Sequence, residues 1–166
     1  MRKALGLYRG TFVILVSVFF ALGLLTSCAP ESESGAHLEL ESTVREYNRL
    51  LAEGFRTLDM GVLEPVATPE QADKEFAQMS ALGEAGIRLD STLVTITFDS
   101  IELADNSAIV ETTEEWDYAQ LDIESDDLIS SQDGVAYELR YSLVRAPDRW
   151  IVTSVESRDP IRPEAP

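Results

Sequence analysis

The chain has 166 residues, with 13 Lys and Arg against 30 Asp and Glu, and its formal net charge is −17. This length suits one domain behind a leader segment. The acidic balance argues against binding of nucleic acid or of an anionic lipid surface, because both depend on basic residues that face the phosphates. The simplest interpretation is a soluble surface whose like charges keep the molecules apart. The alternative is an acidic surface that binds a cationic partner or divalent ions.

The N-terminus has the pattern of a secretory signal peptide. Arg2, Lys3 and Arg9 precede an apolar run at residues 11–25, which is shorter than the roughly 20 residues that a membrane-spanning helix needs. Small residues and then Cys28, the only cysteine, follow the run. Residues 1–27 are therefore predicted to be removed. The mature chain would have 139 residues, with 10 Lys and Arg against 30 Asp and Glu, a formal charge of −20.

The segment LTSC at residues 25–28 resembles the lipobox of bacterial lipoproteins, an aliphatic residue and two small residues before a cysteine. The resemblance implies that Cys28 is acylated and becomes the first residue of a membrane-anchored protein. Stable anchoring needs two signals or chains, and a lipoprotein cysteine supplies them. Because Ala29 stands where an inner-membrane retention signal has Asp, the outer membrane is favoured in a Gram-negative host. The alternative is a buried cysteine, since one cysteine cannot form a disulfide within the chain.

Two helices are expected after this segment. Residues 28–35 hold the acylated cysteine and a flexible tether, of which residues 30–35 read PESESG. A first helix of five or six turns is predicted from Leu40, because apolar residues recur there at helical spacing: Leu40, Val44, Tyr47, Leu51, Phe55 and Leu58. A second helix is predicted from an N-cap at Thr68 to a stop at Gly86. Its predicted inner face is Ala72, Phe76, Met79 and either Leu82 or Gly83.

Beyond Gly86 the apolar residues alternate with a period of two, which predicts four strands, near residues 92–101, 108–118, 137–143 and 150–155. Turns are expected at 105–106 and 147–148, and a long acidic connection at 119–134. Consecutive strands pair antiparallel, and the helices would cover the apolar face of the sheet. The sequence therefore predicts an α+β domain at residues 36–157 and a loose Pro-rich tail at 158–166.

Three segments resemble the nuclear transport factor 2-like (SnoaL-like) superfamily: FRTLDMGVLEPVAT at residues 55–68, the strand pair at 92–116, and the closing pair at 137–156. The resemblance implies that a curved four-stranded antiparallel sheet wraps around the N-terminal helices as a cone. The short extra strand that this superfamily usually has between its helices has no assigned counterpart in the sequence. A cystatin-like helix-on-sheet fold is the alternative. The superfamily includes isomerases, dehydratases, hydrolases and non-catalytic modules, so the fold alone does not choose a function.

A candidate pocket is assigned to aromatic residues and one acid. If Trp116 and Tyr118 face the interior, alternation places Asp117 toward water and Glu114 inside. The resemblance implies that an enzyme of this kind would use a cavity carboxylate with a Tyr as hydrogen-bond donor, which makes Glu114 the best acid. The candidate pocket residues are Phe55, Glu114, Trp116, Tyr118, Tyr137, Tyr141 and Trp150.

Other chemistry has weaker support in the sequence. His37 is the only histidine and lies near the predicted tether, so neither a Ser-His-Asp arrangement nor a zinc site is indicated. The acids of DIESDD at residues 122–127 alternate as in half of a calcium loop, but Asp127 and Asp133 stand where an EF-hand has Gly and Glu.

The sequence thus predicts a membrane-anchored, non-catalytic envelope lipoprotein that binds a protein partner or a small apolar ligand. No cofactor is expected. A small isomerase or hydrolase and a calcium-dependent assembly module are the alternatives.

Overall fold

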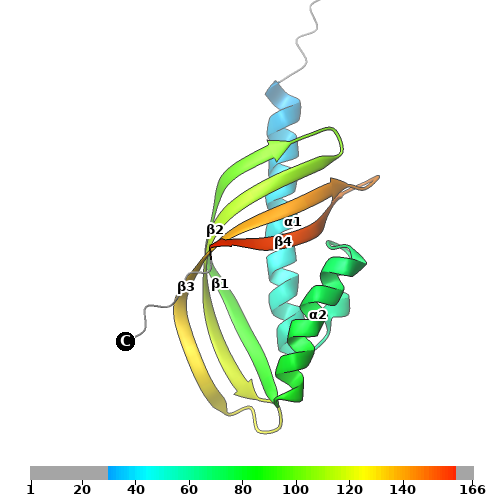
Figure 1. Ribbon diagram of the computed structural model, residues 1–166. Helices are drawn as coiled ribbons and strands as arrows, with labels where there is room; N and C mark the ends of the chain where they lie inside the picture. The colour runs from blue at the N-terminus through cyan, green and yellow to red at the C-terminus, as the bar shows by residue number, and fades with distance from the viewer. Residues whose placement is uncertain (1–29, 160–166) are drawn as a thin grey trace, which may run out of the picture.

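The computed structural model describes residues 30–159, in which two helices pack against one four-stranded sheet (Figure 1). The strands form an antiparallel meander in the order β1-β2-β3-β4, which confirms the predicted fold class. The elements are α1 (Pro30–Thr57), the 3₁₀ helix η1 (Met60–Leu63), α2 (Pro69–Glu84), β1 (Ile87–Leu103), β2 (Ser107–Asp122), β3 (Leu128–Arg145) and β4 (Trp150–Asp159).

The sheet curves around α1, which lies along its concave face, while α2 packs beside the lower half of α1 (Figure 1). Bulges accompany this curvature, because an extra residue on one strand bends the strand and increases its twist. The register shifts twice between β1 and β2, at Leu93/Thr95 and Phe98/Ser100, and again between β2 and β3 at Trp116/Tyr118. These long strands can therefore curve around a helix while they stay paired with their neighbours.

The core lies between the predicted inner stripe of α1 and the concave face of β2, β3 and β4. Leu40, Val44 and Tyr47 are at most 1% exposed. From the sheet they meet the buried side chains of Ala108, Val110, Tyr141, Leu143, Trp150 and Val152. Leu58 is the exception in the predicted stripe, because it follows the last residue of α1 with a positive φ of 59° and is exposed.

Two predicted boundaries at the ends of the domain are wrong. Helix α1 begins at Pro30, so residues 30–35 are helical and do not form a flexible tether. Strand β4 continues to Asp159, so its last residues belong to the sheet and not to a loose tail. The predicted signal peptide, Cys28 and residues 160–166 lie outside the described residues.

The predicted acidic connection at 119–134 is also wrong, because most of it is strand. Strand β2 continues to Asp122 and β3 begins at Leu128, so residues 123–127 alone join them. The extension pairs Ala119 with Ser131 and Gln120 with Ser130. A backbone ladder needs no apolar side chains. The large apolar residues of this extension, Leu121, Leu128 and Ile129, do not alternate with polar ones over a whole strand, so the pattern used to predict strands is absent.

The second helix begins and ends where predicted, but its inner face is different. The Thr68 hydroxyl accepts the backbone N–H of Gln71 at 3.4 Å, and Gly86 has a φ of +75° just beyond the helix. Phe76, predicted to face inward, is 52% exposed, whereas Gln71, Glu75 and Met79 are buried. Gln71 and Glu75 are buried in place of Phe76 because their side chains form hydrogen bonds with Tyr47 and with each other.

The link between the helices touches the sheet. Ala67 forms a single parallel bridge with Val152 of β4, supported by hydrogen bonds from Thr68 N to Val152 O at 2.9 Å and from Val152 N to Val66 O at 2.8 Å. Within residues 30–159, no helix combines the length and apolar character needed to cross a membrane.

Candidate functional site

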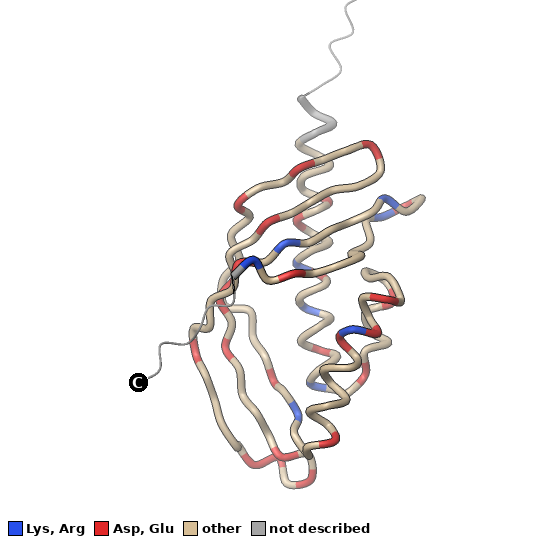
Figure 2. Tube along the Cα trace, in the orientation of Figure 1, with Lys and Arg blue, Asp and Glu red and all other residues tan. Residues whose placement is uncertain are grey.

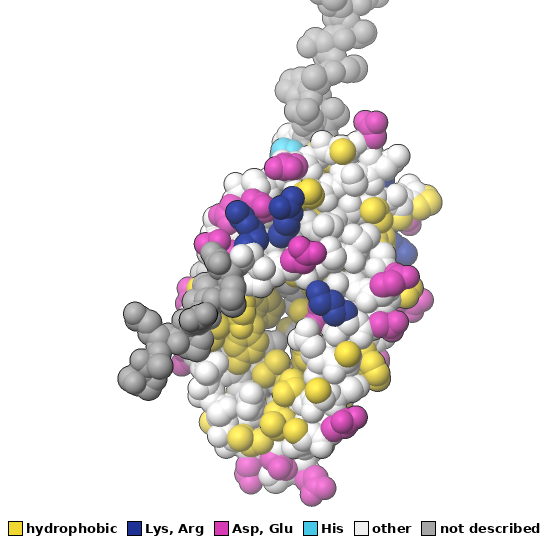
Figure 3. All heavy atoms as spheres, in the orientation of Figure 1, with side chains coloured by type: hydrophobic (Ala, Val, Ile, Leu, Met, Phe, Trp, Pro, Cys, Tyr) yellow, Lys and Arg dark blue, Asp and Glu magenta, His cyan; other side chains and the backbone are white. Residues whose placement is uncertain are grey.

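A cavity of about 400 Å³ opens between α1, α2 and the concave face of the sheet. Figure 3 shows the hollow on this side of the molecule, with hydrophobic side chains gathered in it. None of the lining residues is Lys, Arg or His; they are Tyr47, Asn48, Leu51, Phe55, Glu75, Gln78, Leu89, Ser91, Glu114, Trp116, Tyr118, Gln120, Gln132, Tyr137, Leu139, Tyr141 and Val155. The lining therefore combines aromatic rings with two carboxylates.

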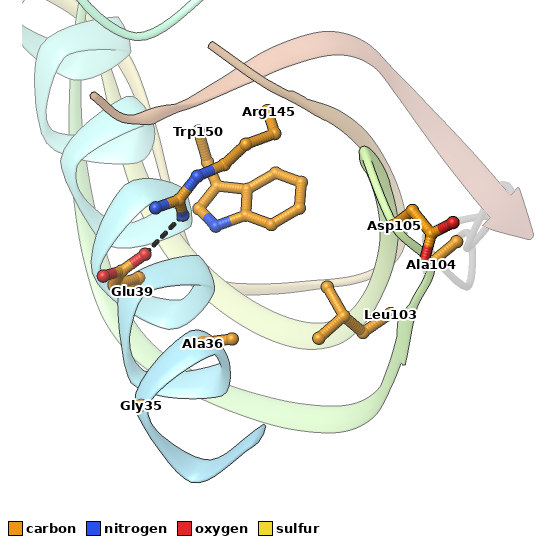
Figure 4. A pocket seen from close by; sticks show the side chains of 8 residues that line it. All are labelled: Gly35, Ala36, Glu39, Leu103, Ala104, Asp105, Arg145 and Trp150. Carbon is orange, nitrogen blue, oxygen red and sulfur yellow. Dashed lines mark hydrogen bonds and ion pairs between the residues drawn. The ribbon is translucent and has the colours of Figure 1, made fainter. Parts of the chain in front are cut away.

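Six of the seven candidate pocket residues lie on this cavity, and Trp150 does not. Trp150 is buried near the N-terminal half of α1, where the Arg145 guanidinium lies 5.2 Å from the indole centroid and pairs with Glu39 (Figure 4). Alternation indicates which face a side chain occupies but not its position along the strand. Trp150 stands at the start of β4 and Val155 at the cavity, about 16 Å apart at ~3.3 Å per residue.

Glu114 lies beneath the cavity floor and is 0% exposed. Its Oε1 accepts hydrogen bonds from Asn48 Nδ2 at 2.9 Å, Thr112 Oγ1 at 2.9 Å and Tyr141 Oη at 2.7 Å. Its Oε2 accepts the Trp116 indole N–H at 2.8 Å. A buried carboxylate needs such donors, because desolvation without them costs several kcal/mol. All four of them come from the protein itself.

Tyr141 keeps its proton in this arrangement. Burial first, and the nearby Glu114 carboxylate second, raise the pKa of Tyr141 well above its ordinary value. Its hydroxyl therefore donates to Glu114 throughout the physiological range. The ring of Tyr141 also packs edge-on against Tyr47, with centroids 6.0 Å apart and planes at 80°. Glu114 is thus fixed from α1, β2 and β3 together.

Glu75 of α2 forms a second buried carboxylate cluster on the cavity wall. It is 7% exposed, and its Oε1 accepts Gln71 Nε2 at 2.6 Å and Tyr47 Oη at 3.1 Å. Burial raises the pKa of Glu75, against smaller opposing contributions from Tyr47, Lys74 and Gln71. The sequence analysis missed Gln71 and Glu75. Their spacing of four, in register with Met79, was the available signal, but the apolar Phe76 outweighed it.

Three aromatic rings form one wall of the cavity. Trp116 stacks on Tyr118 with centroids 6.2 Å apart and planes at 16°, and Tyr118 meets Tyr137 edge-on at 6.3 Å and 88°. Trp116 is buried, while Tyr118 and Tyr137 are half-buried. Asp117 does not line the cavity, and its Oδ1 accepts the backbone N–H of Gly134 at 2.8 Å. The faces predicted for Glu114, Trp116, Asp117 and Tyr118 agree with this arrangement.

The acidic turn at residues 123–127, seen among the acidic residues at the lower end of the sheet in Figure 2, is held by the chain itself. Asp122 Oδ1 accepts the backbone N–H groups of Glu124 and Ser125, both at 2.9 Å, and these bonds lower the pKa of Asp122. Asp126 pairs with Arg88 at 2.8 Å. In the part of the chain that the structure describes, no cluster of acidic, His or Cys side chains could hold a metal ion.

Comparison with known proteins gives structural similarity only. No family model and no curated protein matches this chain. The intermembrane space region of chloroplast protein ARC6 is similar with a TM-score of 0.62 and 19% identity, over 71% of this chain and 92% of that chain. A periplasmic fragment of TraM has a TM-score of 0.52 and 9% identity, over 75% and 98%. These two similarities show the fold alone.

A nuclear transport factor 2-like superfamily protein from Salmonella enterica is also among the similar structures. Its TM-score is 0.48 and its identity 12%, over 77% of this chain and 94% of that chain.

Proposed function

We propose that this protein is a membrane-anchored, non-catalytic lipoprotein of the cell envelope whose domain binds a small, largely apolar molecule. The observation that carries the proposal is the cavity of about 400 Å³ lined by aromatic and aliphatic side chains. Its volume falls in the ~300–1,000 Å³ range of small-molecule sites, which are mostly apolar with a few placed polar groups.

The hydrogen bonds of Glu114 favour binding over general-base catalysis. A catalytic base needs a lone pair within hydrogen-bond reach of the proton that it removes. Three donors already occupy Oε1 of Glu114 and the Trp116 indole occupies Oε2. The carboxylate is also fully buried. These contacts support a structural role for Glu114 beneath a binding cavity.

Blocking the cavity tests the binding proposal. Ser91 is half-buried on the cavity wall, and the next residue, Thr92, is exposed and does not line the cavity. We expect wild-type protein purified from native membranes to carry a small molecule that mass spectrometry detects after denaturation. Ser91→Phe should lose most of that molecule because the new ring fills its space. The matched control Thr92→Phe should retain it, and equal content in both variants, or none in the wild type, would contradict the proposal.

The anchoring part of the proposal comes from the lipobox sequence. Helix α1 begins at Pro30, two residues after Cys28, so an acylated Cys28 would hold the folded domain close to the membrane surface. Two of the similar folds come from an intermembrane space and a periplasm, which agrees with a domain in the envelope.

The anchor is tested at Cys28. We expect mass spectrometry of the mature protein to find Cys28 as the N-terminal residue, carrying two or three acyl chains. Cys28→Ala should abolish processing at this site, because the thiol that accepts the lipid is absent. A Cys28→Ala protein that was still processed and membrane-bound would refute the anchor and leave the cavity proposal standing.

A further inference from the structure

We propose that the molecule bound in the cavity is an organic cation, an ammonium group attached to a small apolar body. This inference rests on the proposed function, since it specifies the ligand of the same cavity. Three features of the described residues support it: the charges around the cavity, the arrangement of the aromatic wall, and the position of Glu75.

The charged side chains that line the cavity are both acidic. Glu114 lies under the floor and Glu75 in the wall, and no Lys, Arg or His lines the space. Lys74 of α2 does not line the cavity, but its ammonium group donates to the backbone carbonyl of the lining residue Val155 at 2.9 Å, and its charge acts on Glu75. Low-dielectric walls strengthen the field of buried charges. The acidic lining therefore favours a cation over an anion.

The aromatic wall brings three rings to one side of the cavity. Trp116 and Tyr118 lie nearly parallel at 6.2 Å, and Tyr137 stands almost perpendicular to Tyr118 at 6.3 Å. Rings set at right angles around a space can contact an ammonium group from two sides, and aromatic cages of this kind recognise quaternary ammonium ions. Here the cage stands beside buried carboxylates, so cation–π attraction and Coulomb attraction act on the same ligand group.

Glu75 is the carboxylate best placed to meet the ligand. The protein donors to Glu75, Tyr47 and Gln71, both bond its Oε1, so its second oxygen has no protein donor among the described residues. Burial raises the pKa of Glu75, and a cation beside it would favour the ionised form. Aliphatic side chains from α1 and the sheet would enclose the body of the ligand: Leu51, Leu89, Leu139 and Val155.

A pair of probes that differ in charge tests this inference. Trimethyl(2-phenylethyl)ammonium and 2-methyl-4-phenylbutan-2-ol have nearly the same shape, but only the first is charged. Binding to the mature protein in nanodiscs of digalactosyldiacylglycerol, an uncharged lipid without an ammonium group, is measured by equilibrium dialysis, with empty nanodiscs subtracted. We expect the cation to bind at least tenfold more tightly than the alcohol. Equal binding of the two probes would overturn the inference but leave the apolar-ligand proposal intact. Absence of binding by both probes would also overturn the inference.

Two variants assign the preference to Glu75. Glu75→Gln keeps an acceptor oxygen for Tyr47 and Gln71, and we expect it to lower the preference for the cation to threefold or less. Glu70→Gln removes the same charge from an exposed position of α2 and should leave the preference unchanged. Thermal melting of both variants confirms that they are folded. An unchanged preference in folded Glu75→Gln protein would overturn the inference.

Discussion

Replacing Glu114 with Ala is expected to destabilise the domain by about 3–5 kcal/mol. The change leaves buried donors of Thr112 and Trp116 without an acceptor, at ~1–3 kcal/mol for each unsatisfied group. It also opens a void beneath the cavity floor. Urea unfolding followed by circular dichroism would measure the loss. In an ordinary domain of ~5–15 kcal/mol this is a large share of the total stability.

The neighbouring acid on β2 provides the matched control. Glu115 lies on the opposite face of the strand and is only half-buried, so Glu115→Ala should change the free energy of unfolding by no more than ~0.5 kcal/mol. Glu114→Gln keeps the shape but places an NH₂ group where one donor now finds an oxygen, so its cost should be intermediate. A loss below 1 kcal/mol for Glu114→Ala would contradict the inference that the hydrogen bonds of Glu114 hold α1 against the sheet.

The parts of the fold that the sequence predicted are those in which apolar periodicity decides burial. The stripe of α1 is predictable because Leu40, Val44 and Tyr47 follow one helical face. Glu114 is predictable as a buried acid because it shares strand parity with Trp116. In both cases a simple period carries the information, and the structure buries these side chains almost completely.

The parts that could not be predicted depend on partners distant in the sequence. Gln71 and Glu75 are buried because Tyr47, on another helix, bonds both of them, and no local pattern shows this pairing. The strand extension around Ala119 depends on its backbone partner Ser131. The bulge near Thr153, where Ser142 pairs with Ser154 but Leu143 pairs with Val152, turns Val155 toward the cavity in place of Ser154. Strict alternation from Trp150 would place Val155 on the face away from the cavity.

The second large effect is expected from truncating two buried aromatic residues, Phe55 near the C-terminal end of α1 and Trp150 at the start of β4. Phe55 is 7% exposed and Trp150 is 4% exposed. Phe→Ala and Trp→Ala changes in cores cost ~3–5 kcal/mol. Trp150→Ala should lie at the upper end of this range, because Trp150 packs where Arg145 covers its ring. Phe55→Ala should lie at the lower end, because its ring is smaller than the indole; both side chains border a cavity, Phe55 the candidate site and Trp150 the pocket in Figure 4.

Phe76, an exposed aromatic residue on α2, is the control that distinguishes the loss of a buried ring from the loss of any ring. Phe76 is 52% exposed, so Phe76→Ala should change the urea midpoint little, although periodicity had assigned this residue to the inner face of its helix. Unfolding curves for the three variants, measured at the same protein concentration, give the comparison directly. A near-zero change for both Phe55→Ala and Trp150→Ala would mean that α1 does not pack on the concave face. A loss for Phe76→Ala as large as theirs would mean that α2 presents Phe76, and not Glu75, to the core.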